Sequence, residues 1–210
     1  MELILIRHGE TDWNKDHVFR GKKDMRLNAT GILQADAVGD ALSERVFEAV
    51  YSSPLKRAMV TATRVAKPHE MEVRPVPDLS DINFGLWEGL TQKEVEERWP
   101  EPYRKWVERP AWARFPHGET VRKAWKRVNS GLREILFLHG TGTIVIVSHR
   151  VPIKMMTAYL TGMKRGQIHQ VKHDPGAISI FEVDGVSGKP MVLNDRRHLE
   201  KLNLPPQDDF

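Results

Sequence analysis

Residues 2–9, ELILIRHG, place a nearly continuous apolar run directly before an Arg-His-Gly triplet. A short apolar run that ends at polar residues and glycine is typical of a buried strand running into a loop. The pattern recurs at residues 143–147, TIVIV, which are followed by Ser148 and His149. We therefore expect two buried strands, each ending beside a histidine.

Strand and helix patterns alternate along the rest of the chain. Further strands are expected at residues 49–51, 72–76, 178–183 and 191–193. Helices are expected at residues 28–44, capped by Asn28, and after Ser52-Ser53-Pro54. Three more are expected from Thr91 to a break at Pro100, from Thr120 to about 139, and at residues 152–160. This alternation predicts an α/β fold: a mostly parallel sheet with helices on both faces and a site at the C-terminal ends of the strands.

A length of 210 residues suits one medium domain with a small insertion. Residues 82–118, rich in Trp and Pro, are predicted to form a helical and loop insertion that covers the site. Its aromatic residues Trp99, Tyr103, Trp106 and Trp112 are expected to pack the insertion. We expect a single domain over residues 1–199 and a flexible tail over residues 200–210.

Composition excludes several classes of function. The chain has no cysteine, which rules out disulfide scaffolds, Cys-ligated zinc, iron–sulfur clusters and thiol nucleophiles. No apolar run approaches the ~18 residues of a membrane span, and the N-terminus lacks signal-peptide features, so a cytoplasmic protein without membrane contact is expected. The net charge of +4 is spread among interspersed acidic and basic residues. This pattern argues against nucleic-acid binding and favours anionic substrates.

Histidines and arginines are predicted to gather at one end of the sheet. Arg7 and His8 follow the first strand, His149 follows the strand at 143–147, and Arg57 lies in the first turn of a helix after the strand at 49–51. That helix N-terminus also favours anions. Phosphoryl transfer needs such a set: a neutral nitrogen nucleophile and fixed cations that hold the phosphoryl oxygens.

These residues resemble the signature of the histidine phosphatase superfamily, also called the phosphoglycerate mutase-like family, in its phosphatase-type branch. The most specific match is Arg7-His8-Gly9-Glu10-Thr11 followed by Trp13-Asn14. Further matches occur in the family's order: Arg20-Gly21, YSSPLKRA at 51–58, FGLWEG at 84–89, PHGET at 116–120, Val147-Ser148-His149, and Asn194 with His198-Leu199. The resemblance covers residues 1–199.

The resemblance implies roles for individual residues. His8 is implied as the nucleophile that forms a phosphohistidine, with Arg7, Arg57 and His149 binding the phosphate and stabilising the transition state. Asn14 is implied to donate to a phosphate oxygen, Gly21 belongs to the binding loop, and Glu119 supports the pocket from behind. No metal or cofactor is implied. The implied partner is a small phosphorylated metabolite, and homodimers are common in the family.

Three departures from the family pattern leave questions open. Asp81 stands where the family usually has a glutamate as proton donor, and Glu88 is the rival donor. Arg20 replaces the usual glutamine, and Arg150 replaces a small residue after the second histidine. Either arginine selects a second acidic group on the substrate or points into solvent.

Three functions fit the resemblance. The favoured one is a metal-independent phosphomonoester hydrolase that acts through a phosphohistidine at His8. A cofactor-dependent phosphoglycerate mutase is the first alternative, but its donor-loop pattern and later Pro-rich run are missing here. A non-catalytic scaffold is the second, although such members usually lose the nucleophile. Phosphoserine, phosphoglycerates, α-ribazole phosphate and sugar phosphates all have family precedents as substrates.

Overall fold

The computed structural model describes residues 1–204, which contain one six-stranded sheet. Its strands are β1 (Glu2–Arg7), β2 (Ala49–Ser52), β3 (Val73–Pro75), β4 (Thr143–Ser148), β5 (Ile178–Asp184) and β6 (Ser187–Asp195), in the order β3-β2-β4-β1-β5-β6. The pairs β3·β2, β2·β4 and β4·β1 are parallel, whereas β5 is antiparallel to both β1 and β6. The predicted α/β class with a mostly parallel sheet is confirmed.

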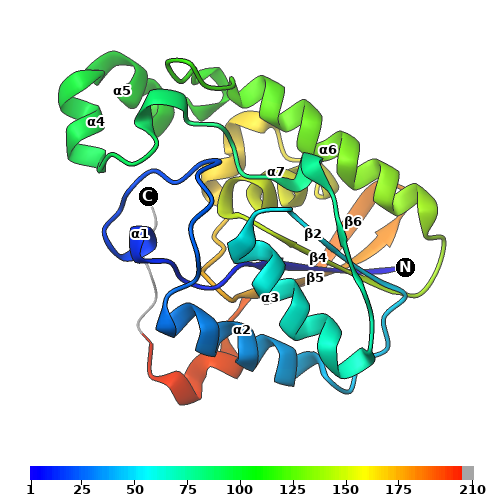
Figure 1. Cartoon of the computed structure of the whole chain (residues 1–210). Coiled ribbons are helices and arrows are strands. Elements are labelled where there is room, and N and C mark those ends of the chain that lie inside the picture. Colours follow the sequence, from blue (N-terminus) through cyan, green and yellow to red (C-terminus); the bar gives the residue numbers. More distant parts are fainter. Residues whose placement is uncertain (205–210) are drawn as a thin grey trace.

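Helices cover both faces of this sheet. On one face, Leu3 and Leu5 of β1 share a buried cluster with α6 (Val121–Leu138) and α7 (Arg150–Leu160). On the other face, Ile4 and Ile6 share a cluster with α2 (Ala29–Leu42) and α3 (Lys56–Ala66). Figure 1 shows α2 and α3 below the sheet and α6 above it. Because successive strand side chains point to opposite faces, the unbroken apolar run in β1 requires both layers.

The predicted caps of two helices are confirmed. The Asn28 side chain accepts a hydrogen bond from the Gly31 N–H at the start of α2, and Thr120 accepts one from the Lys123 N–H at the start of α6. Helix α7 begins at Arg150, two residues before the predicted start. Pro152 lies in its first turn, where a backbone N–H needs no partner within the helix.

Residues 82–118 contain η3 (Gly85–Trp87), α4 (Gln92–Arg98), α5 (Pro100–Glu108) and η4 (Pro110–Trp112). The predicted break at Pro100 is correct, but a new helix starts there, because proline is tolerated in a first turn. Trp106 packs edge-on against Phe84 and Phe115, with ring centroids 5.7 and 5.4 Å apart. The packing prediction is wrong for Trp112, whose surface is 73% exposed.

Five shorter helices complete residues 1–204, besides η3 and η4 above: α1 (Asp12–Lys15), η1 (Lys67–His69), η2 (Pro77–Leu79), η5 (Arg165–Gln170) and η6 (Arg197–Leu202). Helix η6 contacts α2 and continues beyond residue 199, where the tail was expected to start. Residues 205–210 of that predicted tail lie outside the described residues. Within residues 1–204, no helix is both long and apolar enough to cross a membrane.

The backbone of α2 lies unusually close to the loop after β1. A Cβ added to Gly31 would overlap the carbonyl oxygen of Glu10, and one added to Gly9 would overlap the carbonyl oxygen of Gly31. The two glycines therefore allow a backbone contact that fixes the loop beside His8.

We predict that Gly31→Ala lowers the free energy of unfolding by about 1–3 kcal/mol, because the overlap outweighs the better helix propensity of alanine. The matched control is Gly140→Ala, since a Cβ there would meet nothing within 4 Å. The control should shift stability by less than about 1 kcal/mol. Urea unfolding of both variants measures this, and equal losses in the two would contradict the close-contact account.

Candidate active site

The parallel pairing of β1 with β4 brings two histidines together. Arg7 and Ser148 are register partners, so His8 and His149 leave the same end of the sheet. Their ring centroids are 5.0 Å apart, and the side chains are 1% and 0% exposed. Figure 1 shows β1 running from the N-terminus toward α1, with α4 and α5 projecting near that end.

One hydrogen bond determines the protonation of His8. Its Nδ1 lies 2.6 Å from the carbonyl oxygen of Gly9. A carbonyl oxygen only accepts, so Nδ1 carries the proton and Nε2 of the neutral ring keeps its lone pair. Burial, followed by the charges of Arg57 and Arg7, lowers the pKa of His8 well below its usual value. His8 is therefore neutral near pH 7, with a nucleophilic Nε2.

His149 takes the opposite tautomer. Its Nδ1 accepts a hydrogen bond from Nε of Arg57 at 3.1 Å, so the ring proton lies on Nε2, which donates to Oγ of Ser53 at 2.7 Å. Burial, followed by the charge of Arg57, lowers the pKa of His149 well below its usual value. This ring is therefore a neutral hydrogen-bond donor beside His8.

Backbone carbonyls orient the buried arginines. Arg57 donates through Nη1 to Lys23 O and through Nη2 to Gly21 O, both at 2.7 Å. Arg7 donates through Nη1 to His173 O at 2.8 Å. Both guanidiniums are fully buried. Carbonyl oxygens hold the cations without neutralising them, so the site stays strongly positive and suits an anion.

Arg20 and Arg150 are both buried, 7% and 6% exposed, so neither points into solvent. Arg20 donates through Nη1 to Trp13 O at 3.0 Å. Its charge contributes to lowering the pKa values of His8 and His149, which places it near both rings. Arg150 lies at the start of α7, directly after His149, and lines a cavity.

Asp81 joins this cluster from the loop before the insertion. Its Oδ2 lies 3.4 Å from Nη2 of Arg57, and its Oδ1 accepts a hydrogen bond from the Ile82 N–H at 3.0 Å. Glu88 lies farther along: its Oε1 accepts from the N–H groups of Lys22 and Phe84, both at 3.0 Å. Burial raises the pKa of Glu88. Asp81 thus contacts Arg57, while Glu88 joins two loops.

Asn14 lies on α1, a short helix that the sequence analysis missed. Its Oδ1 accepts hydrogen bonds from the Thr11 N–H at 3.0 Å and the Thr11 hydroxyl at 2.8 Å. Its Nδ2 is buried and has no hydrogen-bond partner among the described residues. A buried donor without a partner is costly, and a phosphate oxygen would satisfy it.

Glu119 supports the Asp81 loop from outside the cation cluster. Its Oε1 accepts from the Asn83 N–H at 2.9 Å and from Nη2 of Arg127 at 2.7 Å. Arg127 also donates to the carbonyls of Asp78, Ser80 and Asp81. The Glu119–Arg127 pair therefore positions the Asp81 loop.

The sequence analysis missed four supporting residues: Ser53, Thr61, Arg127 and His173. One signal was present for Arg127, which falls at helical spacing between the buried positions Ala124 and Gly131. A charged residue on an otherwise apolar helix face indicates a buried partner. The other three bond to groups far away in the sequence.

Gly21 is required by its backbone geometry. Its φ is +52°, and a Cβ there would overlap the carboxylate of Glu88. Its carbonyl oxygen is also the acceptor for Arg57. The residue therefore allows the loop to pass between Arg57 and Glu88.

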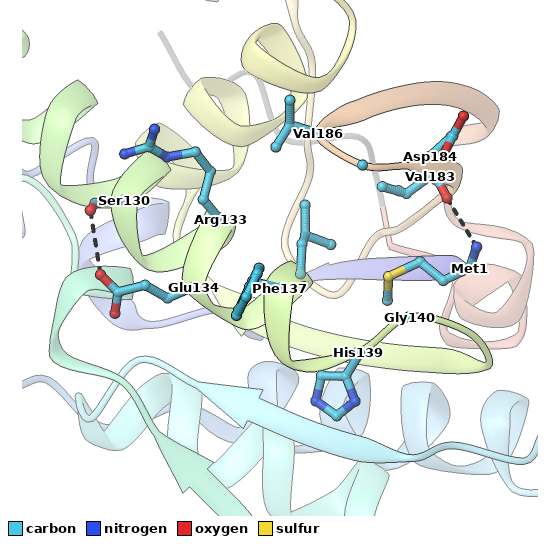
Figure 2. Close-up of a pocket in the computed structure, with 12 residues that line it drawn as sticks. Met1, Ser130, Arg133, Glu134, Phe137, His139, Gly140, Val183, Asp184 and Val186 are labelled. Atoms are coloured by element: carbon cyan, nitrogen blue, oxygen red, sulfur yellow. Dashed lines mark hydrogen bonds between the residues drawn. The ribbon is translucent and has the colours of Figure 1, made fainter.

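No group of three or more His, Asp or Glu side chains in residues 1–204 is placed to hold a metal ion. A cavity of about 660 Å³ is lined by Met1, Phe137 and His139, among others. Figure 2 shows these residues around it. Because Met1 and His139 precede β1 and β4, this cavity lies at the opposite end of the strands from His8.

Comparison with known proteins decides the family. A model described as "Histidine phosphatase superfamily (branch 1)" matches residues 3–196. The chain belongs to the histidine phosphatase superfamily. It is 33% identical over 199 residues to phosphoserine phosphatase 1 of Hydrogenobacter thermophilus, covering 95% of this chain and 94% of that protein. It is 30% identical over 196 residues to the adenosylcobalamin/alpha-ribazole phosphatase of Escherichia coli, covering 93% and 97%.

The superfamily's fold is matched in solved structures. A mutant phosphoserine phosphatase of Entamoeba histolytica, solved in complex with phosphoserine, superposes with a TM-score of 0.85 at 31% identity and covers 94% of this chain and 98% of that one. The predicted resemblance to the phosphatase-type branch is confirmed, and the chain is a phosphatase of this superfamily.

We predict that stability falls with pH below about 6.5, the usual histidine pKa. The folded pKa is well below the usual value for His8 and about 3 for His173, in both cases chiefly because of burial. Below about pH 6.5 the unfolded chain binds protons that the folded chain excludes, so acid favours unfolding. Each such histidine costs about 1.4 kcal/mol between about pH 7.5 and about pH 5.5. In urea unfolding, the free energy of unfolding of His8→Gln should fall over this pH range by that amount less than the free energy of unfolding of wild type. An unchanged pH dependence would show that folded His8 titrates normally.

Proposed function

We propose that the chain is a metal-independent phosphomonoester hydrolase in which His8 accepts the phosphoryl group as a phosphohistidine. The observation that carries this proposal is the hydrogen bond from His8 Nδ1 to the Gly9 carbonyl, which leaves a neutral Nε2 among buried arginines. A nucleophile of this kind needs no metal to lower its pKa. Arg7 and Arg57 supply the positive charge that phosphoryl transfer requires.

In the first step, the Nε2 lone pair of His8 attacks phosphorus in line with the ester oxygen. The P–O bond to the alcohol breaks, and the leaving oxygen takes a proton from the Asp81 carboxyl group. Arg7, Arg57 and the buried Asn14 amide hold the non-bridging oxygens. The Nε2–H of the neutral His149 ring donates to Ser53 in this structure and would turn to a phosphate oxygen, which adds a donor without adding charge. Fixed donors of this kind stabilise charge as it develops.

In the second step, water attacks phosphorus of the phosphohistidine. The P–N bond breaks, its electron pair returns to Nε2 of His8, and the Asp81 carboxylate takes the proton released by the water. Inorganic phosphate leaves, and both His8 and the Asp81 carboxyl group return to their starting states. One group thus serves as acid and then as base.

Asp81 is the better candidate for the proton donor because its carboxyl group lies inside the cation cluster, next to Arg57, which itself contacts His149. The negative charge of a bound phosphate favours the protonated form that the first step requires. Glu88 instead holds two backbone N–H groups, from Lys22 and Phe84. The raised pKa of Glu88 keeps it as the alternative donor.

The proposed substrate is a small phosphorylated metabolite, supported by the relatives named for phosphoserine and alpha-ribazole phosphate. The insertion at residues 82–118 is proposed to cover the leaving group, because Phe84, in the loop that carries Asp81, packs against Trp106 of α5. Residues 1–199 form the proposed single domain.

The central test measures phosphate release with a chelator present, for wild type and His8→Ala. The panel contains p-nitrophenyl phosphate, phosphoserine, 3-phosphoglycerate, α-ribazole phosphate and sugar phosphates. We expect chelator-resistant turnover that falls at least about 10³-fold in the variant, as for the loss of a nucleophile. A quench of wild type with alkaline detergent should trap a phosphoprotein that is stable to base and labile to acid.

Three results would overturn the proposal: turnover that survives in His8→Ala, turnover that the chelator abolishes, or interconversion of 3- and 2-phosphoglycerate without phosphate release. The last of these would identify a mutase.

A second experiment assigns the proton donor. Asp81→Asn should lower kcat/KM for phosphoserine by about 10²–10⁴-fold. The loss for p-nitrophenyl phosphate should be much smaller, because p-nitrophenolate leaves without a proton. Glu88→Gln is the matched control and should affect both substrates to the same degree. If the substrate-dependent loss followed Glu88→Gln instead, Glu88 would be the donor.

A further inference from the structure

A cavity of about 230 Å³ lies between the insertion and α7. Trp106, Pro110 and Ile168 form its apolar walls, and Arg150 and Lys154, one turn apart on α7, supply its positive charge. None of the described residues that line it is Asp or Glu. The cavity is therefore apolar on one side and cationic on the other.

Both sides of the cavity connect to the candidate active site. On the cationic side, Arg150 directly follows His149. On the apolar side, Trp106 packs edge-on against Phe84, which lies three residues after Asp81. The cavity is thus lined by the residue that follows His149 and by a residue that packs against the loop carrying Asp81, the proposed proton donor.

A third contact joins the cavity to the phosphate-binding cations. The buried ring of His173 lies close enough to both Lys154 and Arg7 for their charges to act on it, and its carbonyl oxygen binds Arg7. Positive charge therefore extends from Arg7 through this region to Lys154.

We propose that this cavity binds a second acidic group of the substrate, a carboxylate or a second phosphate, and that Arg150 determines this specificity. The inference rests on the proposed phosphomonoesterase function and narrows its substrate class to phosphomonoesters of small acids. The volume is below the roughly 300–1,000 Å³ of pockets for drug-sized ligands, so it suits a fragment of a few heavy atoms.

The burial of Arg150 and the partial burial of Lys154 make the two cations selective. An ionic hydrogen bond inside an apolar cavity is less screened than one in water. A hydrogen bond to a charged group is worth about 10–150-fold in affinity, so an ester that lacks the acid loses roughly that factor. The p-nitrophenyl group has no acid and cannot use this contact.

The test compares esters that differ only in the acid. The carboxylate pairs are 3-phosphoglycerate with glycerol 3-phosphate, and phosphoserine with phosphoethanolamine. Fructose 1,6-bisphosphate with fructose 6-phosphate tests a second phosphate. We expect wild type to favour the acidic member of at least one pair by about tenfold or more in kcat/KM.

Variants then assign that preference to the cavity. Arg150→Gln should reduce the preference at least about tenfold, chiefly through KM, and Lys154→Met should reduce it independently. Lys105→Met is the matched control: it removes one charge from an exposed position next to Trp106 on α5 and should keep the preference. Equal rates for both members of every pair in wild type, or a preference that survives in both Arg150→Gln and Lys154→Met, would overturn the inference while leaving the proposed function intact.

Binding measured without turnover separates the two proposals. Calorimetry on His8→Ala should show tighter binding of the preferred acidic member than of its partner, and Arg150→Gln in the same background should abolish the difference. If wild type hydrolyses none of the esters but this difference is found, the proposed function fails and the acid site stands. If the binding difference is absent, the acid site fails.

Discussion

The hydrogen bond from His8 Nδ1 to the Gly9 carbonyl is the interaction on which the rest of the site depends. This bond determines which ring nitrogen keeps a lone pair. Residue Gly9, whose carbonyl accepts the bond, is itself held by contacts with two helices. The Gly9 N–H donates to Thr61 of α3, and the Gly9 backbone lies against Gly31 of α2. The tautomer of His8 is therefore a consequence of how the two helices pack on this face of the sheet.

The second constraint is that the buried cations stay charged while the buried histidines stay neutral. Arg7 and Arg57 donate to the carbonyl oxygens of His173, Gly21 and Lys23, which orient the guanidiniums without cancelling their charge. Their charges and the loss of solvent keep protons off His8. The site thus combines strong positive potential with an uncharged ring nitrogen at His8. In the proposed mechanism a phosphate dianion would therefore bind without a change in the protonation of His8.

The sequence predicted the parts of the fold that depend on local pattern. Two continuous apolar runs predicted strands buried on both faces, and strands ending in Arg7-His8 and Ser148-His149 predicted where the site lies. Helix α1 escaped prediction because its four residues, DWNK, have no apolar spacing. Arg127 was missed because its partners other than Glu119 are backbone carbonyls nearly fifty residues away. The sequence left open whether Arg20 and Arg150 are buried. Arg20 is held by the carbonyl oxygen of Trp13, and Arg150 faces a cavity formed with the insertion. Local sequence pattern reveals neither contact.

The protonation state of His8 can be measured most directly by NMR. Long-range ¹H–¹⁵N correlation at about pH 6 gives the ¹⁵N shifts and coupling pattern of the ring, which are assigned by comparison with His8→Gln. We predict a neutral ring with the proton on Nδ1, because the Gly9 carbonyl holds that proton and burial disfavours the charged form. An imidazolium, or a neutral ring protonated on Nε2, would contradict the account, because Nε2 would then have no lone pair with which to attack phosphorus.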